Sequence, residues 1–220
     1  MPAQRCCNRC ALPLPAFVTA TSDEQASLPH TDSLVCGSCL RQPPPIDTTL
    51  AAVPYAYPWS SLISGYKFGE QPGWAGFFAG VLLQAPGVAQ ALEALDHDGW
   101  LIPLPLSAQR LESRGFNQAW ELASALARQS RTRGRADPHL LLRLRHTRPQ
   151  SQLGREARLA NVKGAFQVEP LRAAQLAGRR VVLVDDVMTS GASLFAAAQA
   201  LRDAGVAHIT AVVLARTAPA

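Results

Sequence analysis

Two neighbouring carboxylates, followed by a run of small and hydroxyl-bearing residues, are the part of this chain best suited to chemistry. Asp185 and Asp186 precede a short segment made of Met188, Thr189, Ser190, Gly191, Ala192 and Ser193. Carboxylates accept hydrogen bonds from sugar hydroxyls or hold a metal ion through water. Backbone N–H groups in a glycine-containing turn that opens a helix converge on an anion, most often a phosphate. A phosphorylated sugar satisfies both halves of the segment.

The flanking residues predict the elements that position this segment. Val181 to Val184 are four consecutive aliphatics, too short a run for a helix and rich in β-branching, and they predict a strand buried on both faces. Beyond the hydroxyls, apolar residues recur at helical spacing from Leu194 to Leu201, and Gly205 supplies a C-terminal stop. The predicted order is strand, acidic pair, phosphate-sized loop and helix.

Other sites also place acidic residues at the end of a strand. A Walker B motif needs a G-x-x-x-x-G-K-[ST] partner, but the only lysines, Lys67 and Lys163, lie in no such loop. A receiver-type acidic pocket does not require a hydroxyl-rich turn. A plain buried strand and turn remains the alternative without a function.

The segment resembles the 5-phosphoribosyl-1-pyrophosphate (PRPP) motif of type I phosphoribosyltransferases. Ser190 and Ser193 stand where that motif has threonines, so the hydroxyls are kept and two methyl groups are lost. The resemblance implies that Asp185 and Asp186 are catalytic residues that contact the ribose 2′ and 3′ hydroxyls. It also implies that the loop from Met188 to Ser193 holds the 5-phosphate and that PRPP binds with Mg²⁺.

Four cysteines near the start of the chain have the spacing of metal ligands. They form two C-x-x-C pairs, Cys7 with Cys10 and Cys36 with Cys39. Two such pairs predict a structural four-thiolate Zn²⁺ site, although the interval between them exceeds the common range of about 15 to 20 residues. A redox role is the alternative, but neither pair opens a helix after a strand. Cys6 is the odd thiol, and it could compete with Cys7 for the metal.

Length and composition predict one full domain with a small appendage. The 220 residues are 48 % hydrophobic, which is enough for a real core. Pro43 to Pro45 form a stiff spacer, so we expect a zinc module at 1–45 and an α/β domain with a mostly parallel sheet at 46–220. No apolar run approaches the roughly 20 residues that cross a membrane, which together with the cysteines favours a cytoplasmic protein without a membrane partner.

Charge and aromatic residues are unevenly distributed along the chain. Nine arginines but only two acidic residues lie between Arg128 and Arg158. Such a basic segment predicts binding to a polyanion, which could be a diphosphate or a nucleic acid. The alternative is that it forms a solvent-exposed face without a ligand. Between Tyr55 and Phe78 the chain gathers most of its aromatic residues, which we expect to be mainly core, with stacking on a base or on single-stranded nucleic acid as the alternative.

A second phosphate site is predicted before the basic segment. Trp100 to Ser107 reads as a strand ended by prolines, and Arg110 and Arg114 follow it. A turn at the end of a strand followed by two arginines suits a diphosphate, although the same order of elements serves any α/β domain.

Three further strands and a loop complete the predicted domain. We expect strands from His139 to Arg145, from Ala165 to Val168 and from Ala207 to Ala215. The polar segment at 147–161 is long for a loop in a compact domain, and we interpret it as a hood over the ligand.

Taken in order, these motifs resemble the ComF/GntX family of competence-associated, phosphoribosyltransferase-like proteins. The resemblance rests on both cysteine pairs, on Pro103 to Ser107, on Arg110 and Arg114-Gly-Phe-Asn-Gln118, on Gln152-Leu, Arg158 to Asn161 and Ala165-Phe166, and on the acidic motif. It implies a PRPP-binding protein that transfers a 5-phosphoribosyl group to an unidentified nucleophile and takes part in DNA uptake. A non-catalytic adaptor that binds single-stranded DNA, with a PRPP-sensing or vestigial site, is the alternative. Partners of the competence machinery, such as a DNA helicase or translocase, follow from the resemblance alone.

Overall fold

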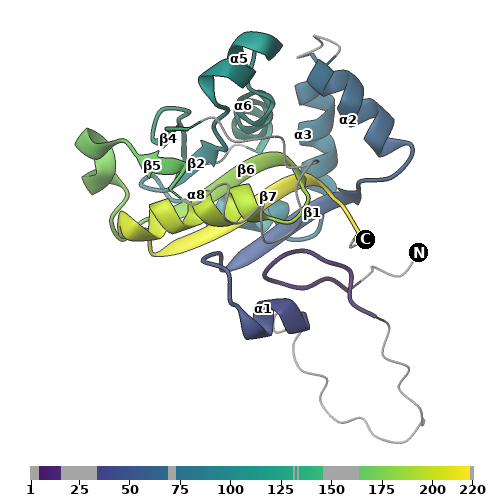
Figure 1. Ribbon diagram of the computed structural model, residues 1–220, viewed down its shortest axis with the longest axis horizontal. Coiled ribbons are helices and arrows are strands. Elements are labelled where there is room, and N and C mark those ends of the chain that lie inside the picture. Colours follow the sequence, from purple (N-terminus) through teal and green to yellow (C-terminus); the bar gives the residue numbers. More distant parts are fainter. Residues whose placement is uncertain are drawn as a thin grey trace, which may run out of the picture.

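The computed structural model describes residues 5–15, 34–68, 73–130, 132, 134–145 and 164–218. At its centre lies a five-stranded sheet in the order β1-β7-β6-β2-β3 (Figure 1). The strands are β1 (Thr48–Pro54), β2 (Trp100–Pro103), β3 (Arg135–Ala136), β6 (Arg180–Met188) and β7 (His208–Arg216). Every neighbouring pair is parallel, so all the strands end at the same edge of the sheet.

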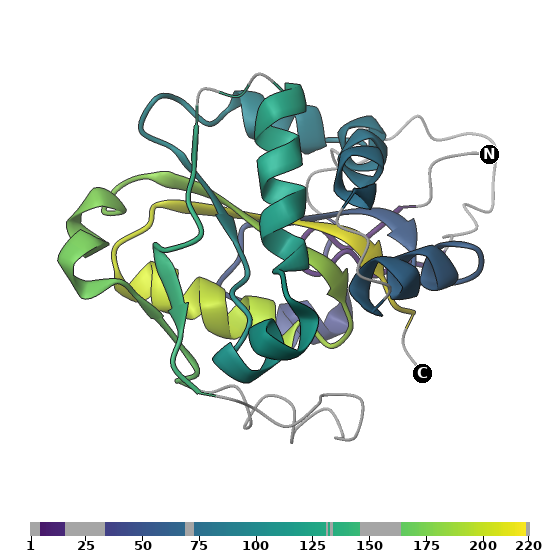
Figure 2. The same ribbon diagram turned by 90° about the horizontal axis from the view of Figure 1, so that it is seen from above.

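Helices cover both faces of the sheet. Figure 1 shows α8 (Ala192–Asp203) and α1 (Gly37–Arg41) on one side and α2 (Trp59–Phe68), α3 (Trp74–Gln84) and α6 (Gln118–Ser130) on the other. Seen from above in Figure 2, α6 crosses the strands and α5 (Ala108–Arg114) lies next to its first turn. The short α4 (Val88–Glu93) packs on α3. A small antiparallel pair, β4 (Leu141–Arg143) with β5 (Phe166–Val168), and the 3₁₀ helix η3 (Pro170–Gln175) complete the described elements.

The buried strand predicted from four aliphatics is the middle of β6. Val181 and Leu183 belong to the core beneath α8, whereas Val182 and Val184 belong to the core beneath α3 and α6. Successive side chains of a strand point to opposite faces, so a central strand covered on both sides needs apolar residues at every position. The predicted α/β class with a mostly parallel sheet is thereby confirmed.

Three strands differ from the sequence-based expectation, and one of them is the two-residue β3, which was not predicted. The predicted strand from His139 to Arg145 is regular only over β4, and it pairs with β5 instead of joining the main sheet. β1 was not predicted, because its sequence, TTLAAVP, lacks the apolar run or alternation that marks a strand. The proposed hood at 147–161 lies outside the described residues.

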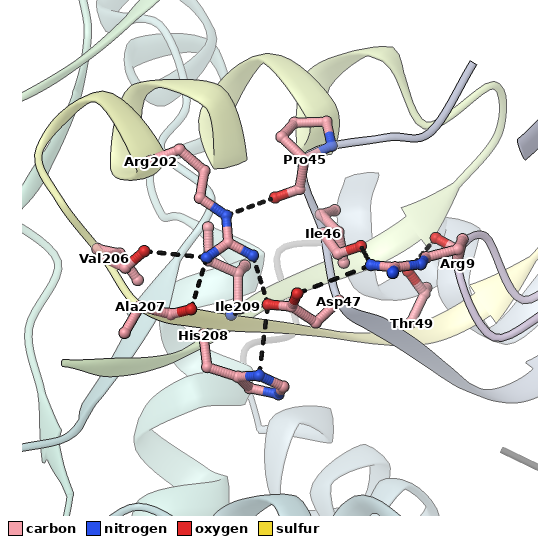
Figure 3. A network of polar contacts seen from close by, with 10 residues as sticks. All are labelled: Arg9, Pro45, Ile46, Asp47, Thr49, Arg202, Val206, Ala207, His208 and Ile209. Carbon is pink, nitrogen blue, oxygen red and sulfur yellow. Dashed lines mark hydrogen bonds and ion pairs between the residues drawn. The ribbon is translucent and has the colours of Figure 1, made fainter. Parts of the chain in front are cut away.

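The edge of the sheet where the strands begin is fastened by Asp47 (Figure 3). Its carboxylate accepts a hydrogen bond of 2.8 Å from the Ile209 backbone N–H and a short one from the Arg202 guanidinium of α8. His208 Nδ1 lies 3.4 Å and Arg9 Nη1 3.7 Å from the same carboxylate. This network joins the cysteine-bearing segment, β7 and α8 at the end of the sheet far from the acidic pair.

Within the described part of the chain, no helix has both the length and the apolar character needed to cross a membrane.

Candidate active site and metal centre

The acidic pair lies near the carboxyl end of β6, where this strand still pairs with β7. The Asp186 N–H donates a 2.8 Å hydrogen bond to Asp185 Oδ1, and the Val187 N–H donates one of 2.6 Å to Asp186 Oδ1. These bonds orient both carboxylates. Burial, together with the negative charge of Asp186, raises the pKa of Asp185 to about 8. Asp185 therefore tends to hold a proton at neutral pH.

Lys67, in the last turn of α2, provides a cation that the sequence did not identify as a site residue. Its Nζ lies 3.0 Å from Asp186 Oδ2, and the two side chains are only 17 % and 10 % exposed. The only available signal was compositional, because lysine is rare in a chain that otherwise uses arginine. Lys67 holds the second carboxylate in place and neutralises part of the charge of the pair.

The hydroxyl loop forms a small cradle between β6 and α8. Gly191 begins α8 with φ +81°, and a Cβ there would lie 2.5 Å from Met188 Cε and 2.7 Å from the Phe195 ring. Only glycine fits this left-handed, crowded position. The cradle encloses about 40 Å³ and is lined by Asp185, residues 187–189 and residues 191–194. Residues of the first turn of α8 line it, and the start of a helix is a common place for an anion site.

The Arg-Gly-Phe-Asn-Gln motif connects α5 to α6, two elements of the site. Gly115 ends α5 with φ +76°. Asn117 Oδ1 accepts a 3.0 Å hydrogen bond from the Ala119 N–H as α6 begins, and its Nδ2 donates one of 3.2 Å to Leu104 O. Gly115 and Asn117 thus shape the connection between the two helices.

Gln118 connects the motif to Lys67. Its buried amide accepts a 3.0 Å hydrogen bond from Arg114 Nη1 at Oε1 and donates one of 3.4 Å from Nε2 to Lys67 O. The Tyr66 hydroxyl donates a 2.9 Å bond to Gln118 O. The cation beside the acidic pair and one of the predicted diphosphate arginines are therefore held by the same side chain.

Three arginines crowd together opposite the acidic pair. Burial and the neighbouring Arg114 charge lower the pKa of Arg110. Burial and the charge of Arg110 lower the pKa of Arg143 to about 10, against the opposing effect of Asp185. Arg143 comes from β4, the strand outside the main sheet, and was not predicted as a site residue. A multiply charged anion placed among these guanidiniums would relieve their mutual repulsion.

One pocket of about 580 Å³ unites these groups. It is lined by Tyr55, Lys67, residues 104–106, Arg110, Arg114, residues 117–119, Arg143, residues 185–187, Thr189 and Ser193. The structure thus brings the acidic pair, both predicted arginines and two loop hydroxyls into one cavity. Ser190 lines neither cavity; its Oγ accepts a long 3.4 Å hydrogen bond from the Ala192 N–H.

The four predicted metal ligands form a compact cluster on the side of α8. The sulfurs of Cys7, Cys10, Cys36 and Cys39 all lie within 4.8 Å of one another. Cys10 Sγ and Cys36 Sγ are 3.7 Å apart. A tetrahedron with zinc–sulfur bonds of about 2.3 Å has edges of roughly 3.8 Å, so the cluster fits such an ion.

The chemistry of the cysteines agrees with a metal centre. Burial raises the pKa of Cys10 to about 11, whereas at Cys36 hydrogen bonds from the cysteines around it outweigh the effect of burial and lower the pKa to about 7. The Cys36 N–H donates a 3.2 Å hydrogen bond to Cys7 Sγ, as backbone amides do in metal knuckles. Cys6 is exposed and lies outside the cluster, so the four C-x-x-C sulfurs can hold a metal ion such as zinc without it.

Comparison with known proteins identifies the family of this chain. Residues 143–219 match the phosphoribosyl transferase domain. Over 195 residues, 88 % of this chain and 83 % of the relative, the chain is 35 % identical to a protein of Escherichia coli O6:H1 named DNA utilization protein YhgH. The chain belongs to the ComF family of competence proteins with a phosphoribosyltransferase domain.

Two other ComF-family relatives extend the comparison. Competence protein F of Haemophilus influenzae is 35 % identical over 184 residues, 82 % of this chain and 78 % of that protein. Competence protein ComFC of Bacillus subtilis is 36 % identical over 118 residues, 53 % of this chain and 44 % of that protein.

Proposed function

We propose that the chain binds PRPP together with Mg²⁺ and transfers its 5-phosphoribosyl group to a nucleophile. The observation that carries this proposal is the single 580 Å³ pocket in which carboxylates, loop hydroxyls and crowded arginines face one another. A phosphorylated sugar with a diphosphate at C1 has a matching group for each of them. The proposal assigns the ribose hydroxyls to Asp185 and Asp186 and the 5-phosphate to the loop from Met188 to Ser193.

The diphosphate then belongs at the arginine side of the pocket. Arg110 and Arg114 were predicted for this role, and Arg143 joins them in the structure. In the transfer, the bond between C1 and the diphosphate oxygen breaks and its electron pair leaves with the diphosphate. A lone pair of the acceptor forms the new bond to C1, and the acceptor gives up a proton. The arginines stabilise the leaving charge, so the protein contributes placement and electrostatics instead of covalent catalysis.

Two metal ions accompany the proposal. Asp185 and Asp186 are oxygen donors of the kind that Mg²⁺ prefers, and the ion, when bound with the diphosphate, supplies further neutralisation of the leaving group. The four cysteines would hold a structural Zn²⁺, with 1–45 as the zinc module and 46–220 as the phosphoribosyltransferase domain. None of the five cysteines forms a disulfide, which suits the reducing cytoplasm, where we expect the protein to act.

Calorimetric titration of the zinc-loaded protein with PRPP, with and without Mg²⁺, tests the proposal. Magnesium-dependent binding is the expected result, and release of pyrophosphate on addition of candidate acceptors would then identify the nucleophile. A protein that binds neither PRPP nor ribose 5-phosphate under either condition would overturn the assignment of the pocket.

A DNA-binding role is the second candidate, and the names of the relatives favour it. They are called DNA utilization and competence proteins. Much of the arginine-rich segment predicted to meet a polyanion lies outside the described residues, so sequence charge is its main support. In this version the chain is an adaptor for single-stranded DNA, and PRPP is sensed instead of consumed.

Salt dependence separates the second candidate from the first. Binding of a fluorescent single-stranded oligonucleotide should weaken steeply as salt increases, because phosphate contacts release counterions. If no oligonucleotide binds at low salt, direct contact with DNA is excluded, and the family association with competence must act through a protein partner such as a helicase.

A further inference from the structure

Arg216, the last residue of β7, is a buried guanidinium between the two sites described above. The residue is only 8 % exposed. Its Nε donates a 2.8 Å hydrogen bond to the backbone oxygen of Cys10, one of the four cluster cysteines. Its Nη1 donates one of 3.0 Å to Met188 O and a short one to Thr189 O, both at the start of the hydroxyl loop. One side chain therefore joins residues that are 206 and 28 positions away in the sequence.

The backbone reinforces this connection. Arg216 is in register with Met188 in the parallel pairing of β6 and β7, and the next residue, Thr217, donates its N–H to Met188 O over 3.1 Å. Arg216 Nη1 also donates a 2.9 Å bond to Thr217 O. The carbonyls at the base of the loop are thus fixed from one point.

Charge explains why a guanidinium occupies this place. A buried cation is costly unless an anion lies near it. Within the described residues no carboxylate forms an ion pair with Arg216. Four thiolates around a divalent metal carry a net charge of about −2. A loaded cysteine centre, next to which Arg216 is bonded through Cys10 O, would supply the anion that balances this guanidinium.

The two sites also share one hydrophobic core. Cys7, Cys10 and Cys39 belong to the same buried cluster as Met188 and as Ala192 and Leu194 of the first turn of α8. Figure 1 shows α1, which carries Cys39, on the same side of the sheet as α8. The cysteine knuckles and residues that shape the phosphate cradle are therefore parts of one densely packed core.

We propose that Arg216 is a positioning residue through which the metal-loaded cysteine centre sets the geometry of the phosphate loop. The inference rests on the proposed function, because it makes the zinc module part of the 5-phosphate site instead of a separate appendage. When the metal leaves, the cysteine thiolates take up protons and the negative charge that balances Arg216 is lost, which releases the carbonyls of Met188 and Thr189 and loosens the cradle.

The test compares two halves of the pocket with two probes. Ribose 5-phosphate reports on the loop, and pyrophosphate with Mg²⁺ reports on the arginine side. Two samples are tested: Arg216→Gln, and the parent protein after removal of zinc with a chelator. In both, affinity for ribose 5-phosphate should fall by about tenfold or more. Affinity for magnesium pyrophosphate should change by less than about threefold. Arg216→Lys keeps the charge but reaches fewer carbonyls, so it should recover part of the loss.

Arg202→Gln is the matched control. Arg202 is also a partly buried arginine bonded to backbone carbonyls, Pro45 O, Val206 O and Ala207 O (Figure 3). It lies beside Asp47, at the edge of the sheet where the strands begin. It should lower stability without a selective effect on ribose 5-phosphate. If folded Arg216→Gln and zinc-free protein bind ribose 5-phosphate as the parent does, the inference is wrong.

Hydrogen exchange separates this inference from the proposed function, because it needs no ligand. Amides at 188–194 should exchange at least about tenfold faster in zinc-free protein, while those around Asp47 keep their protection. If the parent binds no phosphorylated sugar but this loop-specific change appears, the proposed function fails and the coupling stands. Unchanged exchange at the loop would sink the coupling even where Arg216→Gln is too unstable to study.

Discussion

Asp185 and Asp186 are assigned the sugar hydroxyls, so replacing both carboxylates should weaken PRPP binding without abolishing the fold. We expect Asp185→Asn with Asp186→Asn to cost about 2 to 5 kcal/mol of binding free energy, the sum of lost charge-assisted hydrogen bonds. Asp98→Asn, which removes two exposed ion pairs at the other end of the sheet, is the control. Calorimetry measures the difference, and equal affinity in the double variant and the parent would refute the assignment.

The raised pKa of Asp185 predicts a pH dependence of the same binding. Below about 8 this carboxyl tends to hold a proton, whereas donors from ribose and Mg²⁺ require the carboxylate. Affinity for magnesium PRPP should therefore rise as the pH increases through that range. The ligand's own phosphates also titrate, so the slope is compared between the parent and Asp185→Asn. A slope that persists unchanged in the variant would assign the proton elsewhere.

Lys67 and Asp186 form the buried ion pair of the site, and breaking it should be more costly than removing it. Lys67→Met leaves the Asp186 charge uncompensated and should destabilise the protein by about 3 kcal/mol. Adding Asp186→Asn removes that charge and should recover part of the loss. Urea unfolding of the two single variants and the double variant measures the coupling. Additive effects would show that the two charges do not interact.

Candidate site residues could be predicted from the sequence where they lie close together along the chain. The acidic pair, the loop hydroxyls and the two arginines after the proline turn each stand in a short motif. Lys67 and Arg143 carry no such local pattern, because their roles arise only when α2 and β4 fold against β6. The bond from Arg216 to Cys10 spans 206 positions, and no spacing rule could reveal it.

At the scale of elements, the turn from β6 into α8 depends on the backbone of Gly191. Gly191→Ala combines a left-handed φ with a Cβ 2.5 Å from Met188 Cε, and should cost about 2 to 4 kcal/mol of stability. Gly178→Ala is the matched control, since Gly178 has φ +71° but no atom within 4 Å of its Cβ, and should cost only about 1 kcal/mol. Equal losses in urea unfolding would mean that crowding at the cradle contributes nothing.

Elements were predictable in proportion to their burial. Both long central strands, β6 and β7, are apolar on two faces and were recognised from composition alone. β1 pairs with β7 at the sheet edge, is only partly buried and contains small or polar residues, so its sequence gave no comparable signal. The segment of β4 was predicted as a strand, but its pairing with β5 was not. Pairing depends on the tertiary position of the chain around Arg143, which the local sequence does not determine.

At the scale of the whole molecule, the network around Asp47 ties the cysteine-bearing segment to the sheet and predicts sensitivity to acid. The hydrogen bonds from Ile209 and Arg202 hold the pKa of Asp47 below its usual value, against the effect of burial. A carboxyl whose pKa is lowered by folding stabilises the folded protein at pH values above its unfolded-state pKa, which is near 3.8. This stabilisation is lost as the pH falls below that value. Burial also lowers the pKa of His208, so the fold favours the neutral imidazole and stability declines as the pH falls below about 6.5.

Both effects have the same sign, so the free energy of unfolding should fall in two steps between about pH 7 and pH 3. Asp47→Asn should lose about 1 to 3 kcal/mol at neutral pH, because Arg202 and the Ile209 N–H lose a charged acceptor, and should flatten the lower step. His208→Gln should flatten the upper step alone. Urea unfolding across this pH range, with zinc content measured in parallel, checks the result. If Asp47→Asn retains the lower step, acid sensitivity originates in the cysteine centre, whose thiolates also take up protons, and the Asp47 network is only a mechanical fastening.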